Sequence, residues 1–104
     1  MRVTAPLLEV LQVLVDAGGV ELHGWAIIKA TQRGGPTVYA ILERLTDMGW
    51  TTARWDDRAA EPNKPRRRYY QFTSHGAARA RTLLAERRPS RSPQAIRPAV
   101  GGGL

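Results

Sequence analysis

The chain has 104 residues, a formal net charge of +7 and no cysteine. This length supports one domain with a small core, and the lack of cysteine excludes disulfides and thiolate metal sites. No apolar run approaches membrane-spanning length, and no leader-like apolar stretch follows the N-terminus, so we expect a cytoplasmic protein without a membrane partner.

The positive charge is concentrated in the second part of the chain. Residues 1–63 carry six Lys/Arg and eight Asp/Glu, whereas residues 64–104 carry ten Lys/Arg and one Glu. A positive field on one part of a small domain favours a polyanionic partner. A domain with a solvated basic tail would show the same totals, so composition alone leaves both interpretations open.

The first predicted helix, over residues 6–17, is apolar around nearly its whole circumference. Thr4 is a suitable N-cap, and Pro6 lies in the first turn, where its missing N–H costs nothing. The polar residues Glu9, Gln12 and Asp16 form only one narrow stripe. We expect a monomer of this size to be unable to bury the remaining apolar surface.

Two further helices are predicted over residues 22–33 and 37–48, separated by the turn Gly34-Gly35-Pro36. The second helix is expected to bury Trp25 or Ala26, together with Ile28. The third has a clean core stripe at the 3.6-residue period. That stripe consists of Val38, Ile41, Leu42, Leu45 and Met48.

After Gly49 the periodicity changes from helical to two-fold. Strands are predicted over residues 50–55 and 67–72, with a proline-containing loop over 56–65 between them. Alternation places Tyr70 and Phe72 on the core face of the second strand.

A last helix is predicted from residue 74 to 88, capped by Thr73 or Ser74, with Ala77, Ala80 and Leu84 on one stripe. Residues 89–104, rich in Pro, Ser, Arg and Gly, are predicted to form a disordered basic tail.

This element order indicates a winged helix-turn-helix over residues 1–88, mostly α with a two-stranded β-hairpin. The second and third helices would be the reading pair, and the hairpin would be the wing. In the stretch KPRRRYYQFT (residues 64–73) the aromatics would anchor the second wing strand on the core. The arginines beside them would then be held towards phosphates.

Three stretches resemble the PadR family of transcriptional regulators: HGWAIIKAT in the second helix, PTVYAILERLTDMGW in the third, and RRRYYQFTSHG in the wing and the cap that follows it. The resemblance covers residues 6–88 and implies a DNA-binding transcriptional regulator, a repressor. The single C-terminal helix over 74–88 resembles the short subfamily, in which this helix would serve dimerisation. Pro36 and Ala40 stand where the family often has Gly and Pro, so the resemblance does not transfer an operator sequence.

Eight residues are predicted to contact double-stranded DNA. Glu43 and Asp47 would project away from the core and meet phosphates badly, so only the first two turns of the third helix should enter the groove. Wing cations would bind phosphates, which brings affinity and salt dependence rather than sequence readout. The predicted contacts are Thr37, Tyr39, Ala40 and Arg44 on the third helix, and Lys64, Arg66, Arg67 and Arg68 in the wing.

Three of these residues have an alternative placement. Tyr39 fits equally a half-buried aromatic at the helix edge, and Arg44 fits an ion pair. Arg68 lies two positions before Tyr70 and so on the same face of the strand, and its side chain can therefore lean over the edge of the core instead of pointing outwards.

The apolar first helix predicts a homodimer, in which the first and last helices of each chain pack against those of the other. A two-fold axis would place the recognition helices ~34–36 Å apart, facing a palindromic operator. The predicted interface residues are Leu7, Leu8, Leu11, Leu14, Leu83 and Leu84.

No catalytic residues, metal ligands or cofactors are predicted. His23 and His75 lack carboxylates at ligand spacing, and no nucleophile has a base pattern nearby. The three tryptophans are expected to pack in the core and on the strands, and a small-molecule effector stays possible but unsupported. Two rival functions stay open: a sequence-independent nucleic-acid-binding protein and a winged-helix protein-interaction module.

Overall fold

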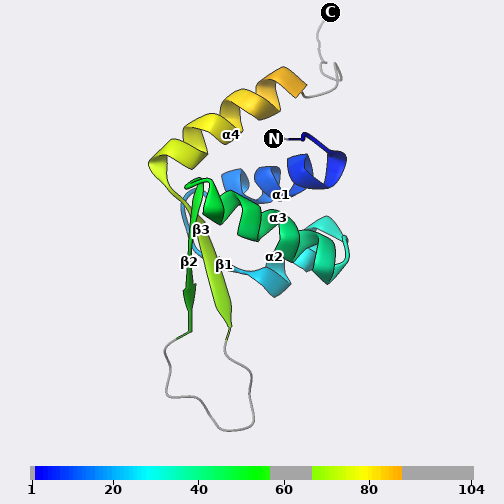
Figure 1. The fold of residues 1–104 in the computed structure, drawn as a ribbon, viewed down its shortest axis with the longest axis vertical. Helices are drawn as coiled ribbons and strands as arrows, with labels where there is room; N and C mark the ends of the chain where they lie inside the picture. Colours follow the sequence, from blue (N-terminus) through cyan, green and yellow to red (C-terminus); the bar gives the residue numbers. More distant parts are fainter. Residues whose placement is uncertain (1, 57–66, 88–104) are drawn as a thin grey trace, which may run out of the picture.

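Four helices and three short strands make up the fold (Figure 1). The computed structural model describes residues 2–56 and 67–87. Lys64, Arg66 and the predicted tail over 89–104 lie outside the described residues, as does almost all of the predicted loop. The elements are α1 (Ala5–Asp16), β1 (Leu22–His23), α2 (Gly24–Thr31), α3 (Gly35–Asp47), β2 (Thr51–Trp55), β3 (Arg68–Phe72) and α4 (Ser74–Arg87).

The strands form an antiparallel sheet in the order β1-β3-β2. The β2–β3 pairing runs from Thr51 opposite Phe72 to Trp55 opposite Arg68. The two-stranded hairpin was therefore incomplete as a prediction, because residues 22–23 pair with β3 instead of beginning α2. A two-residue strand has too few positions to show an alternation of apolar and polar residues.

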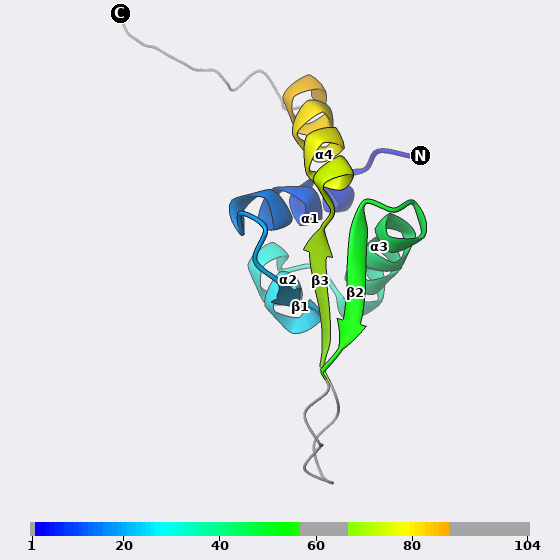
Figure 2. The ribbon, with the colours of Figure 1, turned by 90° about the vertical axis from the view of Figure 1, so that its left-hand side faces the viewer.

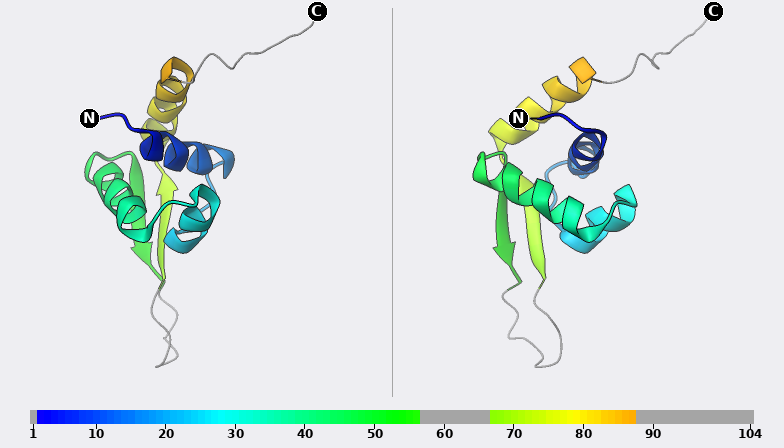
Figure 3. Two further views of the ribbon diagram at one scale, coloured as in Figure 1. Left: turned by 90° about the vertical axis from the view of Figure 1, so that its right-hand side faces the viewer. Right: turned by 45° about the vertical axis from the view of Figure 1, so that its right-hand side comes forward.

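The helices are stacked on one another and against the sheet. In Figures 2 and 3, α4 lies over α1, and α1 lies over the pair formed by α2 and α3. Side chains from all four helices, from β3 and from the turn before β2 meet in one core. Its members are Leu7, Val10, Leu11, Leu14, Ile27, Val38, Leu42, Leu45, Trp50, Tyr70, Ala80 and Leu84.

Helix α1 is covered more completely within one chain than its sequence predicted. Thr4 caps it as expected, since its Oγ1 accepts a hydrogen bond from the Leu7 amide at 3.3 Å. Because α2, α3 and α4 all contact α1, Leu7, Leu11 and Leu14 are no more than 3% exposed. Of the six residues predicted at a dimer interface, only Leu8 and Leu83 are half-buried and retain apolar surface for a second chain.

Of the two alternatives predicted for α2, Ala26 is half-buried, whereas Trp25 is 58% exposed. Ile28 packs against the core as predicted, and its neighbour Ile27 is completely buried. Trp55 is also exposed, so Trp50 is the one tryptophan of the three that packs in the core as expected. Because β1 takes the first two residues of the predicted helix, α2 has only eight residues, and so short a stretch fixes its apolar face poorly.

The start of α4 is attached to the turn between α3 and β2. The Thr73 amide donates to the Trp50 carbonyl at 2.9 Å, and the Thr73 hydroxyl donates to the Gly49 carbonyl at 2.9 Å. The same hydroxyl accepts from the Gly76 amide at 2.9 Å, so Thr73 is the cap of this helix. A Cβ at position 76 would collide with the Trp50 carbonyl, and glycine therefore permits this close approach.

Candidate nucleic-acid interface

Helix α3 is fixed by one buried side, and its N-terminus is open. Val38, Leu42 and Leu45 are completely buried. Gly34 is the N-cap and has no side chain that could bond the first-turn amides. The free N–H groups and the positive end of the helix dipole can therefore bind a phosphate there.

The four residues predicted to contact DNA from this helix are all exposed: Thr37, Tyr39, Ala40 and Arg44. In the described part of the chain no carboxylate pairs with Arg44, so its alternative placement in an ion pair does not occur there. Thr37, Tyr39 and Ala40 lie on the first two turns of α3, and Arg44 lies further along the helix.

Tyr39 combines a packed ring with an accessible hydroxyl. Its ring lies against the start of α2, so closely that a Cβ at position 24 would stand 2.5 Å from both the ring edge and the hydroxyl oxygen. The side chain nevertheless remains 40% exposed, and its hydroxyl has no hydrogen-bond partner among the described residues. Gly24 thus allows Tyr39 to bridge the reading pair while its hydroxyl stays available.

Glu43 is exposed as the sequence predicted, but its carboxylate is bound to β3. Its Oε2 accepts a hydrogen bond from the buried Tyr70 hydroxyl at 2.9 Å and a longer one from Arg68 Nε at 3.4 Å. Burial of Tyr70, with the bond to Glu43 as a second cause, raises the pKa of this tyrosine to about 12. The carboxylate is therefore directed to β3, and the acidic charge at position 43 is largely removed from the groove side of α3.

The two described wing arginines have different surroundings. Arg68 leans over the edge of the core, which is one of its two predicted placements. Its guanidinium lies 4.9 Å from the centre of the Trp55 ring and 5.7 Å from the centre of the Tyr70 ring. Arg67 is exposed and comes just before β3. Its carbonyl accepts from the amide of Asp56, the residue after β2, at 2.6 Å. Arg67 is thus the better placed of the two to meet a phosphate.

Two other arginines are held by glutamates. Arg33, in the turn between α2 and α3, binds Glu9 of α1 through two hydrogen bonds of 2.8 and 2.9 Å. Arg54 of β2 binds Glu21 in the same bidentate way at 2.6 and 2.7 Å. Each glutamate has a lowered carboxyl pKa, chiefly because of the hydrogen bond from its arginine. Both arginines are therefore largely neutralised.

Trp25 and Lys29 extend the exposed surface of the α2–α3 pair onto α2. Neither residue was predicted to contact DNA. Both are exposed, and the Lys29 ammonium lies 6.0 Å from the centre of the Trp25 ring. Trp25 follows Gly24, against which Tyr39 packs, so this pair adjoins the predicted contact surface. The available signal was an aromatic and a cation four positions apart on one helix.

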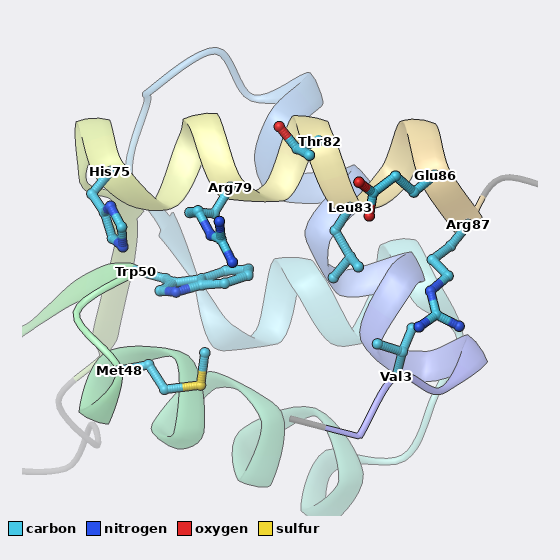
Figure 4. A pocket seen from close by; sticks show the side chains of 9 residues that line it. All are labelled: Val3, Met48, Trp50, His75, Arg79, Thr82, Leu83, Glu86 and Arg87. Carbon is cyan, nitrogen blue, oxygen red and sulfur yellow. The ribbon is translucent and has the colours of Figure 1, made fainter.

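A hollow of about 560 Å³ opens between α4, the end of α3 and the N-terminal segment (Figure 4). Its apolar surface comes from Val3, Met48, Trp50 and Leu83. Its polar lining consists of His75, Arg79, Thr82, Glu86 and Arg87. Among the described residues, no helix is long and apolar enough to cross a membrane, and no cluster of acidic or histidine side chains could hold a metal.

Comparison with known proteins identifies a family. The sequence model of the family described as "Transcriptional regulator PadR-like family" matches residues 10–82. A search among curated proteins found no match.

Similar solved structures confirm the winged-helix fold. Bacillus subtilis PadR in complex with operator DNA is 21% identical with a TM-score of 0.65, over 89% of this chain and 52% of that one. A PadR family regulator from Clostridium difficile R20291 is 17% identical with a TM-score of 0.64, over 80% and 86% of the two chains. Staphylococcus aureus MepR in its DNA-binding conformation is 23% identical with a TM-score of 0.65, over 80% and 57%. The chain thus spans little more than half the length of two of these relatives.

The Tyr39 hydroxyl is predicted to contribute to DNA binding without contributing to folding. Tyr39→Phe keeps the ring against Gly24 and removes one donor, so we expect duplex binding to weaken by about 1 kcal/mol, roughly fivefold, with an unchanged melting temperature. A binding titration and a thermal melt measure the two effects. A lower melting temperature at unchanged affinity would instead assign the hydroxyl to the fold.

Proposed function

Because the chain belongs to the PadR-like family of transcriptional regulators, we propose that it is a homodimeric repressor that binds a palindromic operator sequence-specifically. The observation that carries this proposal is the surface around the first turns of α3. There an uncapped helix N-terminus lies beside the exposed side chains of Thr37, Tyr39 and Ala40. Arg44 is exposed further along the same helix, whose opposite side is buried.

The N-terminal half of α3 is the part that enters the major groove. Thr37 and Tyr39 donate hydrogen bonds to base edges or phosphates, and Ala40 packs against a thymine methyl group. Arg44 binds a phosphate, since no described carboxylate competes for it. The Glu43 carboxylate is bound to β3 and lies beyond this half of the helix, which reduces its repulsion of the DNA backbone.

The wing supplies phosphate contacts that fix the position of the domain on the duplex. Arg67 is exposed where the described part of the hairpin ends. Lys64 and Arg66 belong to the same proposal on the strength of the sequence alone. Such contacts contribute affinity that is independent of sequence, so the side chains of α3 carry the specificity.

A second copy of the chain is proposed to pack along α1 and α4. Leu8 and Leu83 keep apolar surface there, and Val3 and Met48 line the adjoining hollow (Figure 4). Two-fold symmetry would place two α3 helices about one DNA turn apart, ~34–36 Å. Binding of such a dimer across a promoter would exclude the transcription machinery, which is the simplest route to repression.

Sequence specificity is tested by selection from random duplexes followed by competition. We expect one palindromic sequence to be enriched, and its complex to survive a large excess of random duplex. Loss of binding under competition would establish sequence-independent binding instead. Failure to bind any duplex at low salt would favour a protein-interaction module.

Wing charge is predicted to set the salt dependence of binding. The double variant Arg66→Ala/Arg67→Ala removes up to two phosphate contacts per chain, so the slope of log affinity against log salt should shrink by roughly two units per chain. Arg2→Ala/Arg81→Ala is the matched control, since it removes the same charge from two exposed positions outside the wing. Equal slopes for the two double variants would contradict the proposed role of the wing.

The dimer interface is predicted to depend on Leu83. Leu83→Asp places a charge on the half-buried apolar side of α4 and should convert the dimer to a monomer. Light scattering at micromolar concentration measures this change. Ala85→Asp, at an exposed position of the same helix, should leave the dimer intact. A monomeric wild-type chain would refute the dimer itself.

A further inference from the structure

The side chains of Arg67 and Arg68 are adjacent in sequence but differ in how freely they can meet a polyanion. Arg67 is exposed, and in the described part of the chain its guanidinium has no bonded partner. The Arg68 side chain is only 24% exposed and is contacted by two aromatic rings and a carboxylate. The first residue of β3 and the residue before it therefore differ: Arg67 is available to a partner, and Arg68 is held by contacts within the chain.

The contacts that hold Arg68 are unlike those of a surface side chain that happens to meet an acid. Its guanidinium lies 4.9 Å from the centre of the Trp55 ring and 5.7 Å from the centre of the Tyr70 ring, and Nε donates to Glu43 at 3.4 Å. The rings attract the guanidinium to this position, and the carboxylate offsets its charge there. Trp55 stays half exposed even so, which leaves a path for the side chain to leave this site.

The position of Glu43 is itself fixed by a buried group. Tyr70 is completely buried, and its hydroxyl donates to Glu43 Oε2 at 2.9 Å. A buried hydroxyl without a partner is costly, so this hydrogen bond keeps the carboxylate at β3 even though half of its side chain is exposed. This hydrogen bond directs the Glu43 carboxylate towards Arg68.

We propose that Glu43 limits the sequence-independent affinity for DNA by neutralising Arg68 and holding it away from the phosphate backbone. The proposal rests on the DNA-binding function proposed above. A released Arg68 would add one phosphate contact with any sequence, and it would raise the affinity for random DNA as much as the affinity for the operator. An equal gain at both kinds of site leaves the specificity ratio unchanged, but it makes binding to random DNA tighter and more dependent on salt. Glu43 is thus a positioning residue for the wing.

The test variant is Glu43→Gln, which keeps an oxygen acceptor for the Tyr70 hydroxyl but removes the charge opposite Arg68. We expect an unchanged melting temperature and a steeper salt dependence for random duplex, by about 0.9 units for each Arg68 that reaches a phosphate. A contact of this strength that contributes nothing at 1 M salt raises the affinity for random duplex about eightfold at 0.1 M.

Two controls separate the release of Arg68 from the gain of net charge. Asp16→Asn gives the same charge change at the end of α1, where the side chain accepts from Gln12 at 2.8 Å, and should leave the slope unchanged. In the double variant Glu43→Gln/Arg68→Gln, the wild-type slope should return. Arg68→Gln alone should also keep the wild-type slope, and this single variant does not depend on the folding of Glu43→Gln.

The outcomes distinguish this proposal from the function on which it rests. A wild-type chain that binds random duplex, with Glu43→Gln showing the same slope and affinity, overturns the role of Glu43 but not DNA binding. A slope reduced by Arg68→Gln alone shows that Arg68 already contacts phosphates, and it overturns the proposal in the same way. A wild-type chain that binds no duplex at low salt overturns both.

Discussion

Burial of one side of α3 is the constraint that determines what the opposite side presents. Val38, Leu42 and Leu45 are completely buried, and together they fix both the position and the rotation of the helix. Because the helical period then dictates the outer side, Thr37, Ala40 and Arg44 are exposed without needing any contact of their own. The residues that would recognise DNA are therefore separate from those that hold the fold. Substitution on the outer side can change a target sequence at little cost in stability.

The arrangement of charge is more selective than the net charge implies. Arg33, Arg54 and Arg68 are each bound by a glutamate from a different part of the chain. Pairs exposed to this degree add little stability, because solvent screens them and ordering two long side chains costs entropy. Their main effect is to decide which cations remain available. The number of cations available to a partner is therefore smaller than the count of Lys and Arg suggests.

Local patterns allowed most of the fold to be predicted from the sequence. The Thr4 cap, the burial of Val38, Leu42 and Leu45 in α3 and the inward side of β3 depend on residues a few positions apart, and each was confirmed. Met48, also predicted in the α3 stripe, is 37% exposed. Errors arose where the cause is distant in the chain. The Glu43 carboxylate turns towards Tyr70, 27 positions away, and the fit of α2, α3 and α4 on α1 has no signature in the sequence of that helix. Similarly, the pairing of β1 with β3 shifted the start of α2 to Gly24.

The segment Thr73-Ser-His-Gly76 fixes the distance between the start of α4 and the turn that joins α3 to β2. Thr73 bonds the α3–β2 turn and the first turn of α4 at once, and Gly76 leaves room only for the Trp50 carbonyl. A larger residue at position 76 would push α4 off this turn and change the direction in which it leaves the domain. In any dimer formed through α4, that direction sets the angle between the two DNA-reading surfaces. The spacing between two operator half-sites would then be determined by a glycine that never touches DNA.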